Sequence, residues 1–312
     1  MLKVTKAGNV GVNIDCDISK LSEQDYQDIN EIYLDNLLIT FTNQEFLSVP
    51  FAKLVRKMGT FANHKQMLWI KNGENKGRRV HTDPFDYDGP DDEYLIQRVT
   101  GEKSKKGLAT GIFGNGELDW HSNMNGDMDR ARGVALQGAW HCENTHTAFM
   151  DTVKAYDDLP DDIKERCEAV VGHYEYAPEN WAKGVPAPQL NMMKGMGLVD
   201  HKYTMPLVHK GFNGKKGLYF HYHNNCVFPT DPELKDILMQ HCFQDKYCYS
   251  HKWHPGDIVI SDQVLTLHKR VEWNPDIVAK RVLHRITFHY DNMIENYFDR
   301  YTKIKETDIL EY

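Results

Sequence analysis

The chain has 312 residues, enough for one large domain with a substantial core or for two small ones. Hydrophobic residues make up 41% of the chain and charged residues 26%, and the formal net charge is -8 at pH 7, an ordinary balance for a globular protein. The acidic net charge disfavours binding to nucleic-acid backbones, and the aromatic content of 11% disfavours disorder.

The six cysteines show no C-x-x-C spacing, so the sequence does not predict a cysteine-only zinc site. The first ten residues, MLKVTKAGNV, lack an apolar signal core. No stretch approaches the roughly 20 apolar residues that a membrane-spanning helix needs. We therefore expect a cytoplasmic protein with free thiols and no membrane partner.

Helical spacing is strongest near the start of the chain and again in the middle. We expect helices over 21–35 with Ser22 as N-cap, over 46–58 ending at Gly59, over 147–157, over 160–170 after Pro160, and over 231–242. LLITF (37–41) is typical of a short buried strand.

Alternating, β-branched or aromatic segments predict the other strands. These are LIQRV (95–99), GVALQGAW (133–140), GLYFHYH (217–223), DIVISD (257–262) and HRITFHY (284–290). Strands that bracket the helices favour a β-sandwich or barrel with buttressing helices over a βαβ sheet. No low-complexity linker divides the chain, so we expect a single domain over 1–312 with a helical insertion at roughly 147–200.

Most of the 16 histidines have ordinary structural interpretations. His141 and His146 follow a predicted strand and turn, so they would not share a helical face as metal ligands do. His221 and His223 alternate along a predicted strand and would share one face, where they line a pocket or pack in the core.

Two distant segments carry the pattern of a non-haem iron site. The first is GELDWHSN (116–123), and the second is WHPGDIVISD (253–262), followed by His268, Arg281 and Arg285. Such sites hold iron(II) with two histidines and one carboxylate, and residues i and i+2 of a strand can supply two of these ligands on one face. An Arg on a neighbouring strand can bind a carboxylate through its planar fork.

The chain resembles the taurine dioxygenase family of iron(II)/2-oxoglutarate oxygenases at six places in order. These are IDCDISKLSEQD with LLITFTNQEF, GIFGNGELDWHSN, HTAFMDTVKAYDDLP, MPLVHK with GKKGLYFHYH, WHPGDIVISDQVLTLHKR, and RVLHRITF. The resemblance implies a mainly β, mixed α/β fold: a double-stranded β-helix (jelly-roll) core with buttressing helices. It also implies that iron(II) is the metal and that 2-oxoglutarate and dioxygen are the co-substrates.

Carried over residue by residue, the resemblance makes His121 and His268 iron ligands. Arg285 would bind the distal carboxylate of 2-oxoglutarate, with Thr147 as the hydroxyl partner of the same group. Arg281, four residues before Arg285, would be a supporting or substrate-facing residue.

The chain departs from the family pattern at the carboxylate ligand, where Asn123 stands in place of Asp or Glu. A neutral amide oxygen is a weaker donor for iron(II). Asn123 either ligates weakly, leaves a position for water or an anion, or marks an inactivated form. Related halogenases carry Ala or Gly there and bind chloride, but Asn is bulkier. Asp119, about 7 Å along the strand from His121, is close enough to orient a ligand but is better explained as a solvated carboxylate.

We expect oxidation of a C–H bond by hydroxylation, desaturation or cyclisation. The alternatives are radical halogenation and a non-catalytic binding protein of the same fold. Polar pocket candidates suit a small polar or anionic substrate such as an amino acid: Gln97, Arg98, His221, His223, Asn224 and Arg281. The sequence leaves open whether the chain forms a homo-oligomer.

Overall fold

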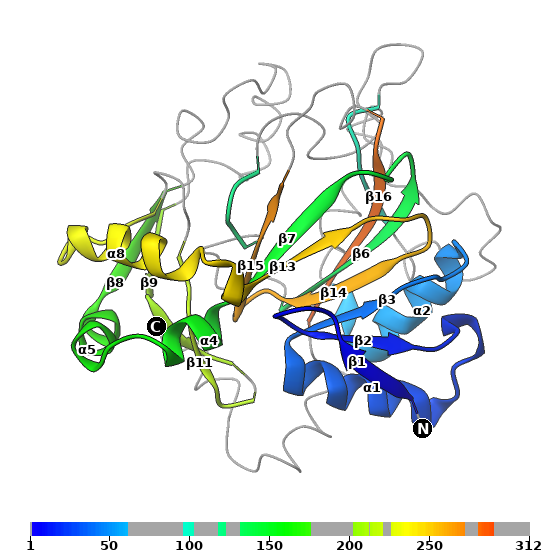
Figure 1. Cartoon of the computed structure of the whole chain (residues 1–312), viewed down its shortest axis with the longest axis horizontal. Coiled ribbons are helices and arrows are strands. Elements are labelled where there is room, and N and C mark those ends of the chain that lie inside the picture. The colour runs from blue at the N-terminus through cyan, green and yellow to red at the C-terminus, as the bar shows by residue number, and fades with distance from the viewer. Residues whose placement is uncertain are drawn as a thin grey trace.

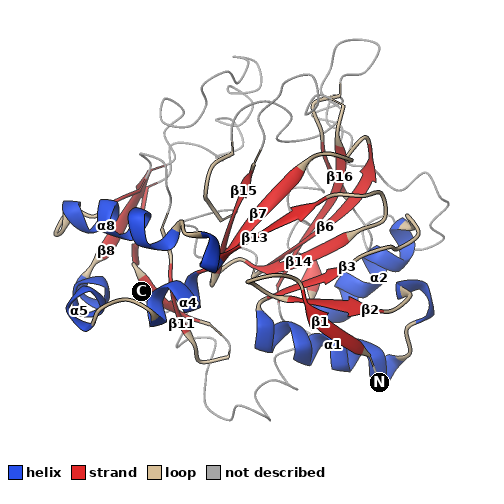
Figure 2. Cartoon of the chain, viewed as in Figure 1, coloured by secondary structure: helices blue, strands red, loops and turns tan. Residues whose placement is uncertain are grey.

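The protein is a mainly β, mixed α/β molecule in the computed structural model (Figures 1 and 2). The structure describes residues 2–61, 96–102, 118–122, 132–175, 202–211, 213–220, 226–271 and 280–289. The helices are α1 (Glu23–Asn36), α2 (Ser48–Met58), α4 (Thr152–Asp157), α5 (Asp161–Ala169) and α8 (Pro232–Cys242), with 3-10 turns η1 (Ile18–Lys20) and η2 (Asp245–Tyr247).

The strands fall into four sheets. The largest holds β1 (Lys3–Lys6), β2 (Val12–Asp15), β3 (Leu38–Phe41), β4 (Thr60–Phe61), β5 (Gln97–Val99), β6 (Gly133–Trp140), β14 (Ile258–Asp262) and β16 (Val282–His289). The second holds β7 (His146–Asp151), β13 (Cys248–Lys252) and β15 (Thr266–Arg270). Two small sheets hold β8 (Val171–Glu175), β9 (Lys202–Pro206) and β12 (Cys226–Val227), and β10 (Val208–Lys210) with β11 (Lys216–Leu218).

The largest sheet runs in the order β1-β2-β3-β14-β6-β16-β4, with β5 also paired to β16. Its central pairs β3·β14, β14·β6 and β6·β16 are antiparallel, whereas β2 and β3 are parallel and are joined through α1. The second sheet runs in the order β13-β7-β15 and is antiparallel throughout.

Strand alternation gives the large sheet two different apolar faces. Ala135 and Ile286 pack with residues of α1 and α2, which lie against one face (Figure 1). Leu136 and Leu283 point to the opposite face of the same strands. They belong to another cluster, which includes Phe149 of β7 and Trp253 after β13. The second sheet therefore packs its inner face against the large sheet, so that an apolar interior lies between the two.

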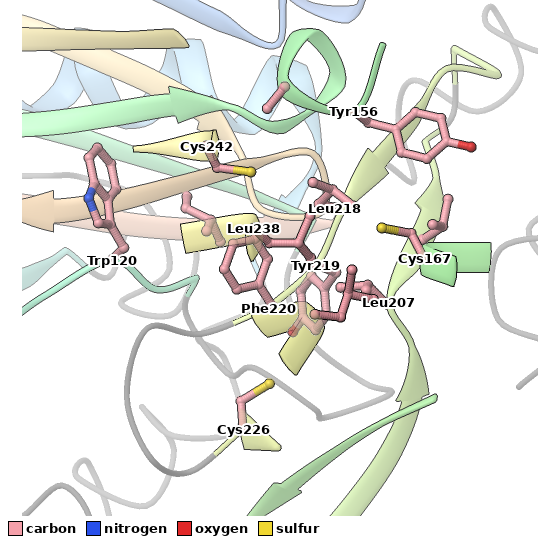
Figure 3. Packing of buried hydrophobic residues seen from close by; sticks show 14 of the residues in the cluster. Trp120, Tyr156, Cys167, Leu207, Leu218, Tyr219, Phe220, Cys226, Leu238 and Cys242 are labelled. Carbon is pink, nitrogen blue, oxygen red and sulfur yellow. The ribbon is translucent and has the colours of Figure 1, made fainter. Parts of the chain in front are cut away.

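The outer face of the second sheet joins a third core. Met150 of β7 and Leu267 of β15 pack there with residues of α4, α5, α8 and β11. Figure 3 shows this cluster, with Trp120, Leu218, Phe220, Leu238 and Cys242 among its members. The cluster therefore packs α4, α5 and α8, here called the helical lobe, against the strands that carry the candidate site.

Helix ends agree with the sequence in most places. Ser22 and Asp25 form a capping box at the start of α1, and α2 ends at Gly59. Helices α5 and α8 also lie where the spacing predicts them. The predicted strands at 37–41, 133–140, 257–262 and 284–290 are confirmed within one or two residues.

The helix predicted over 147–157 is wrong in its first half. Residues His146–Asp151 form β7, which pairs with β13 on one side and β15 on the other, and these pairings override the local helical pattern. Only Thr152–Asp157 is helical, and the Asp151 carboxylate caps it by accepting from the backbone N–H groups of Val153 and Lys154. The strand predicted over 217–223 is short: β11 ends at Leu218, and residues 221–225 lie outside the described ranges.

No helix within the described ranges is both long and apolar enough to cross a bilayer. All six cysteines lie in these ranges and are free thiols.

Candidate metal and co-substrate site

His121 and His268 are brought side by side by a short antiparallel bridge. The His121 backbone N–H donates to the His268 carbonyl at 3.0 Å, and the His268 N–H donates back at 2.8 Å. Their imidazole centroids lie 4.3 Å apart. Two histidines that lie 147 positions apart in the chain therefore present adjacent rings on one side of β15.

The tautomer of His121 is set by a backbone carbonyl. Its Nδ1 lies 2.5 Å from the Asp119 carbonyl oxygen, which can only accept a hydrogen bond. In the neutral ring Nδ1 therefore carries the proton and Nε2 carries the lone pair, which is the tautomer that binds a metal through Nε2. The Asp119 carboxylate itself accepts from the Trp120 backbone N–H at 2.8 Å, so Asp119 orients His121 through its main chain.

The inner face of the second sheet carries two cross-strand rows of side chains. The first row runs Tyr249, Phe149, His268 and then His121. The second row, one pleat further along the strands, runs His251, Thr147 and Arg270. Residues two apart on a strand lie about 7 Å apart and face the same way, so the second row lies next to the histidine pair on the same face.

Buried guanidinium groups gather beside this second row. Burial, together with the positive charge of Arg281, lowers the pKa of Arg270 to about 9. Both side chains are buried, Arg270 at 7% and Arg281 at 3% exposure. Two buried positive charges repel each other, so an anion bound beside them would be stabilised by both.

Arg285 occupies a separate position on β16. It donates through Nη1 to Oε1 of its cross-strand partner Gln97 at 2.5 Å. Burial lowers the pKa of Arg285 to about 10. Leu283 belongs to the interior cluster, so Arg285, two residues further along the strand, faces the interior as well.

Arg98, predicted to line the substrate pocket, points the other way from Gln97. Its guanidinium lies over the Trp140 ring at 4.9 Å and forms an ion pair with Glu102 at 2.5 Å. Its cross-strand partner is His284, which alternates with Arg285. We therefore do not carry Arg98 into the site.

The other predicted pocket and ligand residues, Asn123, His221, His223 and Asn224, lie outside the described residues. His141 lies in the turn after β6 with a positive φ of 54°, and His146 begins β7. The two therefore do not share a helical face, as the sequence indicated.

Sequence reasoning missed Arg270 and His251. Arg270 lies two residues after His268, a predicted iron ligand. Residues i and i+2 of a strand point to the same side, and this rule could have placed Arg270 beside the site. His251 precedes the WHPGD segment by two residues, but only the register of β13 against β7 places it beside Thr147.

The donor set fits a divalent transition metal as far as it is described. Two neutral imidazoles suit iron(II), and the first has its tautomer fixed by a second partner. Within the described ranges no cluster of three His, Cys, Asp or Glu side chains forms a metal site. A third protein ligand would have to come from elsewhere in the chain, and the sequence prediction for it is Asn123.

Comparisons with known proteins give a consistent result. Residues 3–287 match the family model described as "Taurine catabolism dioxygenase TauD, TfdA family". The (S)-phenoxypropionate/alpha-ketoglutarate-dioxygenase of Sphingobium herbicidovorans is 27% identical over 276 residues, which cover 85% of this chain and 86% of that protein.

A second relative matches over a shorter span. The alpha-ketoglutarate-dependent 2,4-dichlorophenoxyacetate dioxygenase of a Burkholderia strain is 27% identical over 175 residues, or 54% of this chain and 57% of that protein. The matched region thus spans little more than half of that relative. Among solved structures, AAD-2 in complex with Mn(II) and N-oxalylglycine has a TM-score of 0.61 at 16% identity, covering 92% of this chain and 97% of that one.

Proposed function

Because the chain belongs to the TauD/TfdA family of 2-oxoglutarate-dependent dioxygenases, we propose that it oxidises a C–H bond of a small substrate that carries an anionic group. Its cofactor is iron(II), and its co-substrates are 2-oxoglutarate and dioxygen. The reaction that fits best is hydroxylation, desaturation or cyclisation. The observation that carries the proposal is the pair of rows that places two imidazoles next to a buried, doubly cationic site.

His121 and His268 would hold the iron, His121 through Nε2 because its Nδ1 faces the Asp119 carbonyl oxygen. When bound, the metal supplies the activation of dioxygen that is coupled to decarboxylation of 2-oxoglutarate to succinate. The protein supplies the fixed positions of the two rings and an interior from which water is excluded.

The distal carboxylate of 2-oxoglutarate would bind to Thr147, Arg270 and Arg281. Thr147 and Arg270 are cross-strand partners, and Arg281 lies near enough to Arg270 to lower its pKa. This proposal exchanges the roles that the sequence predicted for Arg281 and Arg285. The reason is the surroundings of each guanidinium, because Arg285 donates to Gln97, its cross-strand partner in the large sheet, whereas Arg281 lies beside Arg270.

Arg285 and Gln97 would then receive the anionic group of the substrate. Two relatives are named for phenoxypropionate and 2,4-dichlorophenoxyacetate, both carboxylates. Burial lowers the pKa of Arg285 only to about 10, so its guanidinium keeps its charge at neutral pH, and a substrate carboxylate beside it would stabilise that buried charge. An amino acid remains our preferred substrate class within the carboxylates.

An anaerobic titration with iron(II) and 2-oxoglutarate tests these assignments through the visible charge-transfer band. Arg281→Ala should weaken 2-oxoglutarate binding by about 2–3 kcal/mol, because a charge-assisted contact is lost. Arg285→Ala should leave that affinity within about threefold and instead raise KM for a carboxylate substrate. The reverse result would restore the sequence-based assignment, and a wild-type protein without the band would favour the non-catalytic alternative.

Asn123 has its own proposal, which rests on the sequence. We propose that Asn123 stands at the usual carboxylate position and attenuates iron binding, since Asn is nearly isosteric with Asp. Asn123→Asp should then tighten iron(II) binding and increase oxygenase turnover. Loss of activity in Asn123→Asp, with halogenated product formed by the wild type in chloride or bromide, would instead support halogenation.

The remaining expectations stand as proposals. The two facing sheets, with an apolar cluster between them, support a double-stranded β-helix core. We propose one domain over 1–312, a reducing cytoplasmic setting in keeping with six free thiols, and a homo-oligomeric state to be measured in solution.

A further inference from the structure

The Trp and Asp of the WHPGD segment are not used by the proposed reaction, yet both side chains are buried beside its second row. Trp253 is 0% exposed, and its Nε1–H donates to the Thr147 hydroxyl oxygen at 2.9 Å. Indole nitrogen can only donate, so this contact occupies an acceptor position of Thr147 and leaves the hydroxyl proton to find its own acceptor.

The cross-strand neighbours of Thr147 do not provide that acceptor. On one side is Arg270, whose guanidinium can only donate. On the other is His251, whose two ring nitrogens face other groups: Nδ1 lies 2.9 Å from the Tyr249 hydroxyl and Nε2 lies 3.4 Å from the Asp257 carboxylate. Neither cross-strand neighbour therefore takes the hydroxyl proton, which a ligand that accepts hydrogen bonds, such as a carboxylate, could take.

The indole is itself held in place. Its ring stands nearly perpendicular to the His251 ring, at 76° with centroids 4.5 Å apart. Asp257, three residues beyond His254 in the same turn, lies beside His251 and accepts from the Asn43 backbone N–H at 3.1 Å. The indole therefore packs against a His251 ring that Asp257 holds in turn.

We propose that Trp253 is a positioning residue for the co-substrate: it fixes the Thr147 hydroxyl so that its proton points at the distal carboxylate of 2-oxoglutarate. The inference rests on the proposed role of Thr147 and extends it to a residue that touches neither metal nor co-substrate. No chemical step is assigned to the indole.

The test uses the full chain loaded anaerobically with iron(II). Trp253→Phe keeps the aromatic ring and removes the N–H, and it should weaken 2-oxoglutarate binding about threefold to tenfold, the range of one neutral hydrogen bond. Iron(II) affinity, and kcat at saturating 2-oxoglutarate, should stay close to wild type. Trp140→Phe is the matched control, because Trp140 packs with Arg98 and should leave 2-oxoglutarate binding unchanged.

Two further measurements separate positioning from simple packing. Pyruvate is a 2-oxo acid without the distal carboxylate, so Trp253→Phe should not change its binding. Thr147→Val should weaken 2-oxoglutarate binding, and adding Trp253→Phe to it should have no further effect, whereas in Thr147→Ser the tryptophan should still matter. Equal weakening for pyruvate, or full additivity with Thr147→Val, overturns the inference.

The outcomes distinguish this inference from the proposed function. Unchanged 2-oxoglutarate affinity in Thr147→Val would overturn the proposed role of Thr147 and this inference with it, whereas weakened binding in Thr147→Val with unchanged binding in Trp253→Phe would overturn this inference alone. If Trp253→Phe does not fold, the Thr147→Val variant with isotope-labelled tryptophan can be compared with the wild type by NMR, through the solvent exchange rate of the Trp253 indole N–H. The Trp253 indole proton should then exchange faster with solvent than in the wild type, and an unchanged exchange rate would contradict the hydrogen bond on which the inference depends.

Discussion

The two faces of β7 and β15 are equally buried but differ in what they do. On the outer face, Met150 and Leu267 join an apolar core shared with the helical lobe. On the inner face, residues of opposite parity on the same strands, Thr147, His268 and Arg270, carry the proposed chemistry. Burial therefore does not identify the site here, and strand parity does, because successive side chains point to opposite sides. A register shift of one residue would exchange the two sets.

Changing adjacent residues on the two faces should have the largest and most different effects. His268→Ala should abolish measurable iron(II) binding and turnover, because one of the two proposed metal donors is lost. Leu267→Ala, one position away, should lower the free energy of unfolding by about 2–5 kcal/mol, the usual cost of a buried Leu truncation, and leave the metal affinity of the folded protein unchanged. Denaturant unfolding and iron(II) titration of both variants check this. If His268→Ala bound iron as wild type, the inner face would not be the metal face.

This parity explains how much the sequence could predict. The spacing of apolar residues predicted α1, β6 and β14 nearly to the residue, because each buries a regular stripe or face. The His pair was found through the family resemblance. Arg270 was missed because its role depends on which strand lies next to β15, and cross-strand register is a long-range property. The stretch 147–151 was assigned to a helix for the same reason, since pairing on both sides decided its structure.

Replacing Phe149 tests whether an inner-face residue contributes to both stability and metal binding. It lies between Tyr249 and His268 in the first row, with its ring centroid 6.2 Å from that of His268, and it also belongs to the interior apolar cluster. Phe149→Ala should cost about 3–5 kcal/mol of stability and also weaken iron(II) binding, because His268 loses its packing neighbour. Met150→Ala on the outer face is the control and should affect only unfolding. An unchanged metal affinity in folded Phe149→Ala would show that packing against Phe149 does not hold His268 in place.

The pH dependence of unfolding should report the inner-face pair of His251 and Asp257. Burial alone would raise the pKa of the Asp257 carboxyl, but the hydrogen bond and charge of His251 outweigh it and lower the pKa below 3.8. A carboxyl with a lower pKa in the folded state adds stability above its unfolded pKa, and this stability is lost as the pH falls through the folded value. The contribution should therefore be complete at neutral pH and disappear in acid below about pH 4.

Asp257→Asn is the matching variant for this titration. It should lower stability at pH 7 by about 1–3 kcal/mol, because His251 keeps a buried but weaker partner, and it should flatten the acid limb of the stability curve. Urea unfolding at a series of pH values between 2 and 7 measures both effects. A variant with the same acid limb as wild type would assign the lost stability to other carboxyl groups.

The smallest effect is expected where neither face is involved. Ser22 caps α1 on the far side of the large sheet, where its side chain accepts from the Asp25 backbone N–H. Ser22→Ala should cost about 1 kcal/mol of stability and leave 2-oxoglutarate and iron(II) affinity unchanged. Thermal unfolding and the anaerobic titration compare the two properties, and a changed cofactor affinity would show that the helical layer is coupled to the inner face.

The bridge between His121 and His268 also covers a strand edge. Among the strands that the structure describes, β15 lies at the end of its sheet, and Leu118 and His121 pair with its outer edge through backbone hydrogen bonds with Arg270 and His268. An uncovered edge exposes backbone donors and acceptors that can recruit a strand from another chain. A metal that joins His121 to His268 fastens this covering segment in addition to the three backbone hydrogen bonds. Metal starvation should therefore promote self-association through β15, and the concentration of available iron would set the solubility of the protein as well as its activity.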